Sequence, residues 1–168
     1  MSFFPLLSAL FALSLPKRRS EIRHFPDCSL IFMSFLPLLI AFAFGKIIGN
    51  HLRWDLDDHL VDTLWYLVFI PFGEECLFRS WLYGILDRVW PGKMFTATNP
   101  LPIAVWGSAI AFSLWHIQNF TNSSPGLVFL QIAYTLVTGL WLGVLRNKTG
   151  QVWPGVFAHT LINLAAGS

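Results

Sequence analysis

The chain has 168 residues, of which 55% are hydrophobic, 16% aromatic and only 12% charged, with a net charge of +2. A soluble domain carries roughly a quarter charged residues, so this composition excludes an ordinary soluble fold and indicates an integral membrane protein. The size predicts one domain over residues 1–168. The small positive charge is clustered, which indicates membrane topology and no nucleic-acid partner. Cys28 and Cys76 lie in apolar segments without metal-type spacing, so we expect free thiols.

Long apolar segments predict an all-α bundle of about six transmembrane helices around a polar cavity. A helix needs about 20 mostly apolar residues to cross the hydrocarbon core, and five segments approach that length. A sixth, at the N-terminus, is shorter, but its basic cluster follows the apolar run, so we expect a first span and not a signal peptide. In chain order the segments are 3–15, 28–49, 61–86, 101–120, 126–145 and 151–167.

The charges of the connecting loops alternate along the chain and predict its orientation. Lysine and arginine follow the first, third and fifth segments, whereas the other loops are acidic or uncharged. Basic loops lie in the cytoplasm under the positive-inside rule, so we expect both termini outside. The basic loops contain Lys17, Arg18, Arg19 and Arg23, then Arg88 and Lys93, then Arg146 and Lys148.

The segment GEECLFR (73–79) places three ionisable side chains inside a strongly apolar span. Each such residue costs on the order of 2.5–3.5 kcal/mol in the membrane, which makes it a candidate for function. Glu75 and Arg79 are four residues apart and share a helix face, so we expect an ion pair. Glu74 lies about 140° round the helix from Arg79 and projects elsewhere. A carboxylate without a partner in a partly dry pocket suits a general base.

Two later spans each carry a histidine with a partner four residues away. Phe112 can orient His116, and His159 and Asn163 present two polar tips to one side of their helix. Polar groups in lipid need partners, so we expect both histidines to converge with Glu74 in one cavity. A glutamate base with a histidine suits activation of water, and the other donors suit stabilisation of an oxyanion.

Two alternatives use the same residues. One glutamate and two histidines can ligate zinc and leave a fourth position open to water, although the chain lacks the HExxH arrangement of many zinc proteases. A non-proteolytic membrane protein, such as an immunity factor, a scaffold or a small transporter subunit, would use the polar cluster to dock helices. A second glutamate and histidines on separate spans favour an enzyme over this structural interpretation.

The three motifs, taken in order, resemble the CPBP family of intramembrane endopeptidases, formerly called the Abi family. That family includes CAAX prenyl proteases and bacteriocin-processing proteins. The resemblance covers about residues 61–168. The family pattern E-E-x-x-x-R, F-x-x-x-H and H-x-x-x-N is matched by Glu74, Glu75 and Arg79, by Phe112 and His116, and by His159 and Asn163.

The resemblance implies a glutamic protease that needs no metal or other cofactor. The implied roles are water activation by Glu74 and His116, an oxyanion hole formed by His159 and Asn163, and support from Glu75, Arg79 and Phe112. The implied organisation is a set of N-terminal spans and loops (1–60) followed by a catalytic core (61–168).

The resemblance also implies a substrate class and a location. The substrate would be a membrane-anchored protein or peptide, cut near its anchor or its C-terminus by a multi-pass protein of the bacterial cell membrane. Compact members of this kind include some that act beside C-terminal sorting signals. Because His116 lies near the outer end of its expected span, we expect a cavity open to the outside.

Overall fold

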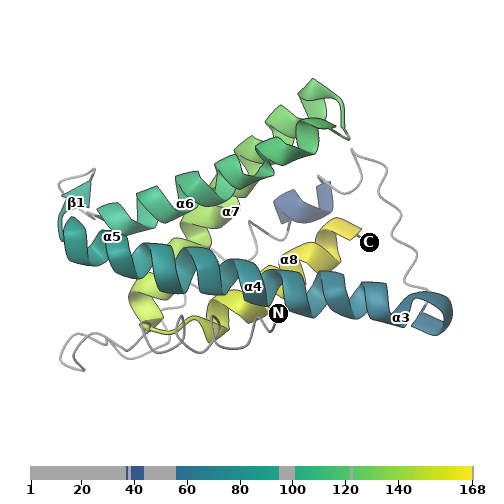
Figure 1. Cartoon of the computed structure of the whole chain (residues 1–168), viewed down its shortest axis with the longest axis horizontal. Helices are drawn as coiled ribbons and strands as arrows, with labels where there is room; N and C mark the ends of the chain where they lie inside the picture. Colours follow the sequence, from purple (N-terminus) through teal and green to yellow (C-terminus); the bar gives the residue numbers. More distant parts are fainter. Residues whose placement is uncertain (1–36, 38, 44–55, 95–100, 122, 168) are drawn as a thin grey trace, which may run out of the picture.

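The computed structural model describes residues 37, 39–43, 56–94, 101–121 and 123–167, which are predominantly helical (Figure 1). The expected first span, 3–15, lies outside the described residues. Of the expected second span, 28–49, only residues 37 and 39–43 are described, and they are helical. The other four expected spans coincide with helices. The all-α fold class is therefore confirmed, whereas the count of six spans stays a prediction.

The third expected span is the middle of one long helical rod (Figure 1). Its parts are α3 (Leu56–Leu64), a π-helical stretch (Trp65–Phe69), α4 (Ile70–Glu75), a second π-helical stretch (Cys76–Leu82) and α5 (Tyr83–Val89). In a π-helix each N–H donates to the carbonyl five residues earlier in the chain. This geometry is rare in proteins, but where it occurs it is often found at functional sites. Both glutamates of GEECLFR are therefore the last two residues of α4, and the arginine lies in the second π-helical stretch.

Pro71 accounts for part of this irregularity. It has no backbone N–H. It therefore cannot donate to the Leu67 carbonyl, as it would in an α-helix, or to the Tyr66 carbonyl, as it would in a π-helix. Two side chains of the C-terminal helix donate to these carbonyls: the Thr160 hydroxyl to Leu67 at 2.7 Å and the Asn163 amide to Tyr66 at 3.4 Å. The missing N–H leaves one of these carbonyls without its backbone donor, and the C-terminal helix docks on both of them.

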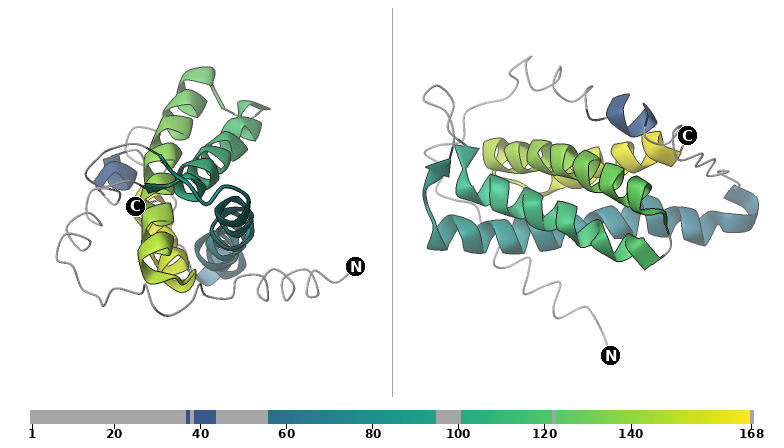
Figure 2. Two further views of the ribbon diagram at one scale, coloured as in Figure 1. Left: turned by 90° about the vertical axis from the view of Figure 1, so that its left-hand side faces the viewer. Right: turned by 90° about the horizontal axis from the view of Figure 1, so that it is seen from above.

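Three further helices pack along this rod. Their bounds are α6 (Ile103–Trp115), continued by a 3₁₀ stretch (His116–Thr121), α7 (Pro125–Thr149) and α8 (Trp153–Gly167). A short antiparallel pair, β1 (Lys93–Met94) and β2 (Leu101–Pro102), precedes them. α6 packs against α7 and the second π-helical stretch, and α8 packs against α4 and α7 (Figure 2).

Small residues let α6 and α7 lie close together. A Cβ added to Gly139 would lie 3.4 Å from the Cα atom of Ala109, and one added to Gly143 would lie 3.4 Å from the Val105 carbonyl oxygen. Close backbone approach of this kind drives helix association where lipid removes the hydrophobic effect. Gly150 follows the last residue of α7, and its φ of 67° is the left-handed conformation favoured by glycine at a helix C-terminus.

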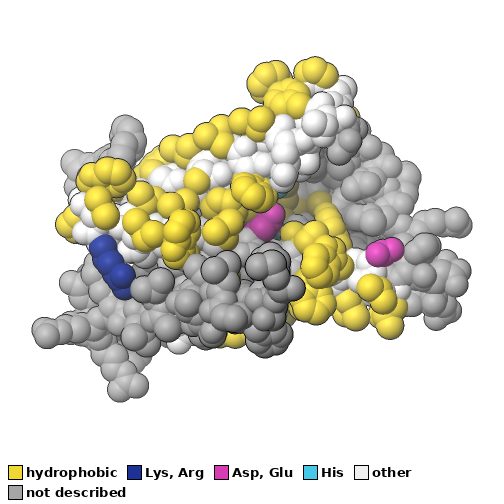
Figure 3. Space-filling view, in the orientation of Figure 1, with side chains coloured by type: hydrophobic (Ala, Val, Ile, Leu, Met, Phe, Trp, Pro, Cys, Tyr) yellow, Lys and Arg dark blue, Asp and Glu magenta, His cyan; other side chains and the backbone are white. Residues whose placement is uncertain are grey.

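The outer surface of the described part is strongly apolar. Hydrophobic side chains cover much of the visible face of the long rod and of α6 (Figure 3), and large ones such as Val61 and Phe157 are 77% and 68% exposed. Apolar surface of this extent marks contact with a membrane or a partner. Among the helices of the described residues, α7 alone is both long and apolar enough to cross a membrane by length and composition.

Candidate active site

Glu75 and Arg79 form the ion pair that their spacing predicts. Arg79 Nη1 lies 3.2 Å from Glu75 Oε1, and neither side chain is exposed. Neighbouring helices hold the guanidinium as well: Arg79 Nη2 donates to the Gly139 carbonyl at 3.2 Å, and Arg79 Cζ lies 4.2 Å from the centre of the Phe112 ring. The pair therefore ties the helix of the glutamates to both α6 and α7.

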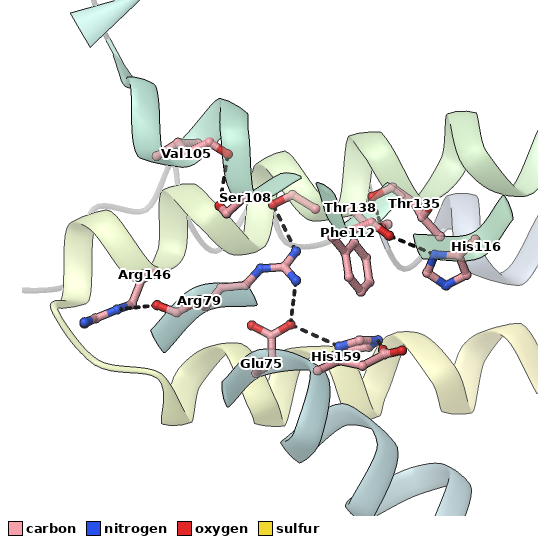
Figure 4. Close-up of polar contacts among 12 residues, drawn as sticks. Glu75, Arg79, Val105, Ser108, Phe112, His116, Thr135, Thr138, Arg146 and His159 are labelled. Atoms are coloured by element: carbon pink, nitrogen blue, oxygen red, sulfur yellow. Dashed lines mark hydrogen bonds and ion pairs between the residues drawn. The ribbon is translucent and has the colours of Figure 1, made fainter. Parts of the chain in front are cut away.

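His159 lies between the two glutamates of the motif, and Figure 4 shows its contact with Glu75. Its Nδ1 atom is 3.1 Å from Glu75 Oε1, and its Nε2 atom is 3.6 Å from Glu74 Oε2. The sequence assigned Glu75 and Arg79 a supporting role, and the contact between Glu75 and His159 was not predicted. Glu75 contacts an imidazole of the site directly, because α8 packs against α4 and brings His159 to the end of α4.

This geometry restricts how His159 is protonated. Glu75 already pairs with Arg79 and accepts from the Nδ1–H of the imidazole. The Nε2 atom faces Glu74, so a proton between them resides either on the imidazole or on the Glu74 carboxyl. Either position of that proton leaves the four side chains without net charge, because Glu75 balances Arg79 and one proton is shared between His159 and Glu74. A buried site favours such neutrality, because an unpaired buried charge is expensive.

His116 reaches the same region from the end of α6. Its Nδ1 atom lies 3.0 Å from the Phe112 carbonyl oxygen, so an Nδ1–H donates there and leaves the Nε2 lone pair for another proton. The Phe112 ring lies edge-on to both imidazoles, 5.2 Å from that of His116 and 5.6 Å from that of His159. The predicted packing of Phe112 on His116 is present, with His159 as a second partner that spacing did not indicate.

A cavity of about 330 Å³ brings the predicted residues together. Its lining includes Glu74 from α4, His116 from the start of the 3₁₀ stretch after α6, and His159 and Asn163 from α8. Within the described part of the chain, no hydrogen bond or ion pair joins Glu74 to His116, so these two side chains meet only through the space of the cavity. A molecule that enters the cavity can contact both of them.

Asn163 lies one helical turn beyond His159 and also lines the cavity. Its Nδ2 atom donates to the Tyr66 carbonyl at 3.4 Å. A carboxamide nitrogen carries two hydrogens, so this contact orients the amide and leaves one donor for a ligand. The expected placement of two polar tips on one side of the last helix is therefore present.

The polar residues that α7 contributes to the cavity lining were not predicted from the sequence. Gln131, Thr135 and Thr138 line the cavity, and their i, i+4, i+7 spacing places them on one helix face. That spacing, inside an otherwise apolar span, is the signal that would have identified them. The two hydroxyls donate to carbonyls of their own helix, Thr135 to Gln131 at 2.8 Å and Thr138 to Tyr134 at 3.2 Å. They therefore face the cavity as acceptors.

A zinc site of the kind considered above needs three ligands directed at one point. Among the residues that the structure describes, no group of three His, Cys, Asp or Glu side chains is placed to hold a metal ion. Both nitrogens of His159 face carboxylate oxygens instead. The donor set in this arrangement does not fit zinc.

Comparison with known proteins places the chain in a family. A family model described as Rce1-like, Type II CAAX prenyl endopeptidase Rce1-like, matches residues 57–165. Curated proteins and solved structures give no significant match. The matched stretch covers well over half of the chain and contains all three motifs, which confirms the resemblance drawn from them. The chain therefore belongs to the Rce1-like type II CAAX prenyl endopeptidases, a family of integral membrane proteases that hydrolyse peptide bonds in protein substrates.

Proposed function

We propose that this chain is an intramembrane glutamic endopeptidase in which Glu74 and His116 activate the attacking water. The supporting observation is that side chains of all three motifs line one cavity of about 330 Å³. Of the two glutamates, Glu74 has a side chain that is 20% exposed, whereas that of Glu75 is fully buried. A general base must reach the proton that it abstracts, so Glu74 is the better candidate.

In this mechanism Glu74 accepts a proton from water as the water oxygen bonds to the carbonyl carbon of the scissile peptide. The Nε2 atom of His116 helps to orient that water. The negative charge that develops on the carbonyl oxygen is stabilised by the free amide hydrogen of Asn163 and by an Nε2–H of protonated His159. The bond to nitrogen then breaks, and the proton held by Glu74 passes to the departing amine.

Glu75, Arg79 and Phe112 support these groups in the proposal. Glu75 fixes the His159 ring by accepting from Nδ1–H, so that Nε2 is directed toward Glu74 and the cavity. Arg79 neutralises Glu75. Phe112 packs against both imidazoles and limits their rotation. We place all of these residues in a catalytic core, 61–168, of one domain with six spans.

We further propose that the cavity opens on the outer side of the bacterial cell membrane. Asn119 and Gln131 line the cavity and flank the uncharged α6–α7 connection, whereas Arg146 and Lys148 lie at the far end of α7. The basic end is cytoplasmic under the positive-inside rule. A membrane-anchored protein, cut near its anchor or its C-terminus, would then enter from outside.

The side of access has a direct test. In a protein with Cys28 and Cys76 replaced by alanine, a cysteine introduced at Gln118, beside His116, should react with an impermeant thiol reagent added outside the cell. Labelling only from the cytoplasmic side would overturn the outward orientation and leave the catalytic assignment unchanged.

The catalytic assignment is tested with Glu74→Gln in protein reconstituted into vesicles. We expect a loss of at least about 100-fold in hydrolysis of a quenched peptide with a prenylated C-terminal CAAX sequence, at unchanged protein level and thermal stability. Asp62→Asn, an exposed carboxylate on the same rod, is the matched control and should retain activity. Protein termini compared between wild-type and Glu74→Gln cells identify natural substrates. Normal hydrolysis by Glu74→Gln would remove the assignment.

A further inference from the structure

Two carboxamides line the cavity on elements that carry neither glutamate. Asn119 belongs to the 3₁₀ stretch after α6, and Gln131 belongs to α7; Asn119 Nδ2 donates to Gln131 Oε1 at 2.8 Å. We infer that this amide pair binds the backbone of the substrate peptide, with Gln131 Nε2 donating to a carbonyl and Asn119 Oδ1 accepting from an N–H. The inference rests on the proposed proteolytic function and names how the substrate is held.

The chemistry of the amide pair favours a peptide group as its ligand. Each carboxamide has two N–H donors and one oxygen acceptor, and their mutual hydrogen bond uses one donor and one lone pair. In the described part of the chain, Gln131 Nε2 and Asn119 Oδ1 make no other hydrogen bond, and both residues are only partly buried. A peptide unit presents the complementary carbonyl and N–H. The pair is also uncharged, so it holds a backbone without selecting a charged side chain.

A substrate needs such partners inside a membrane. A peptide bond is cut only when the segment around it is exposed to the attacking water, which frees backbone groups that a helix would have satisfied. Each unsatisfied group costs several kcal/mol in hydrocarbon. Asn163 and His159 supply donors near the glutamates, and the amide pair supplies a donor and an acceptor together elsewhere on the cavity wall. The ligand class is therefore a stretch of extended peptide next to the scissile bond.

The amide pair is held at a fixed place relative to the reacting groups. Asn119 lies three residues after His116 in the same 3₁₀ stretch. The Ser113 hydroxyl donates to the Ile132 carbonyl at 2.6 Å, which fastens the end of α6 to α7 beside Gln131. The two helices are thus joined without the amide pair. A purely structural role for the pair predicts lost stability and no dependence on the backbone chemistry of the substrate.

The test measures binding to the Glu74→Gln protein, so that it does not depend on hydrolysis. The probe is a dye-labelled peptide with a prenylated CAAX sequence, with a series in which one backbone amide at a time is replaced by an ester that lacks the N–H. We expect Asn119→Leu and Gln131→Leu each to raise Kd about tenfold. One ester in the series should lack the N–H that Asn119 Oδ1 binds. For that peptide Asn119→Leu should not raise Kd any further, because the hydrogen bond is already absent.

Two further variants control for folding. Gln131→Glu keeps an acceptor for Asn119 Nδ2 and replaces the donor with an oxygen, so it should preserve stability and still weaken binding. Gln151→Leu makes the same change as Gln131→Leu at an exposed carboxamide between α7 and α8, and it should leave Kd unchanged. If the leucine variants fold poorly, Gln131→Glu alone decides between binding and structure.

The outcomes separate this inference from the proposed function. Unchanged Kd in Gln131→Glu and in both leucine variants overturns the amide pair, and so does full additivity of Asn119→Leu with every ester. Binding that depends on the pair, without hydrolysis by the wild type, would contradict the protease mechanism alone. Hydrolysis by the wild type with unchanged binding in the variants would contradict the amide pair alone. Failure of the Glu74→Gln protein to bind the probe counts against both.

Discussion

His159 Nδ1 lies 3.1 Å from Oε1 of Glu75, the same carboxylate oxygen that pairs with Arg79 Nη1 at 3.2 Å. One oxygen atom therefore connects α8 to the long rod, and the arginine extends the connection to the Gly139 carbonyl of α7. This contact both holds the three helical elements together and orients the His159 imidazole. A change that weakens helix docking at Glu75 is expected to disturb the site as well.

Glu75→Gln should strongly destabilise the protein. An amide cannot neutralise Arg79, and breaking a buried ion pair by removing one partner costs roughly 3–5 kcal/mol. The double variant Glu75→Gln with Arg79→Met should recover part of that loss, because it no longer buries an uncompensated charge. The free energy of unfolding, measured by titration in mixed detergent micelles, checks both. A double variant no more stable than the single one would show that the charge of Arg79 is not the source of the loss.

Thr160→Val should destabilise the protein because it leaves the Leu67 carbonyl without its hydroxyl donor. The expected cost is about 1–3 kcal/mol, the penalty for an unsatisfied buried acceptor. Pro71→Ala supplies a backbone N–H to the same part of the rod, so Thr160→Val should cost less in that background. A double-mutant cycle on unfolding free energies measures the coupling.

Thr149→Val is the control for this cycle, since the Thr149 hydroxyl bonds within the last turn of α7 and to the following loop. Its effect should be the same with proline or alanine at position 71. Strict additivity of Thr160→Val and Pro71→Ala would show that the proline does not create the docking point.

Part of the site followed from the sequence because it depends on contacts within one helix. The apolar segments gave four of the helices that the structure describes, and i, i+4 spacing gave the Glu75–Arg79 pair and the packing of Phe112 on His116. These relationships need only helical periodicity, which hydrophobic and polar positions record directly.

The rest depends on how helices meet, which periodicity does not record. The spacing argument assumed a regular α-helix, but two π-helical stretches interrupt the rod and Arg79 lies in the second. The contact between His159 and Glu75 requires α8 to approach the rod closely, which depends on Gly155, a residue with no chemistry of its own. A further helix of the cavity, α7, contributes polar residues that are uncharged, and the sequence patterns considered above concern ionisable groups.

Gly155→Ala tests that close approach. A Cβ at this position would lie 2.8 Å from Glu75 Oε2, so the carboxylate or α8 must move. Overpacking of this kind costs about 1–3 kcal/mol, and hydrolysis should fall because His159, one turn further along α8, moves with the helix. Thermal stability and peptide hydrolysis are the measurements.

Gly84→Ala is the matched control, because no atom lies within 4 Å of the added Cβ in that helix. It should be neutral, or stabilising by up to about 1 kcal/mol, since alanine is favoured over glycine in helices. Equal stability and equal activity of the two alanine variants would mean that α8 has room at Glu75.

Arg146→Met should loosen the part of the rod that carries Arg79. In an α-helix the Arg79 carbonyl would accept from the Tyr83 N–H, but here that N–H is directed at Phe78 and Ser80. The Arg146 Nε atom donates to the Arg79 carbonyl instead, at 3.0 Å, from the last turn of α7. Loss of a hydrogen bond from a charged group costs about 1.5–3 kcal/mol.

Arg79 also carries the guanidinium that neutralises Glu75. Because Arg146→Met loosens the backbone at Arg79, it is also expected to slow peptide hydrolysis. Lys148→Gln removes an exposed positive charge two residues further along α7 and controls for the change in net charge. It should alter the unfolding free energy by no more than about 0.5 kcal/mol. If the two variants unfold at the same free energy, the Arg79 carbonyl is satisfied without Arg146, and the π-helical stretch holds its geometry from contacts within the rod alone.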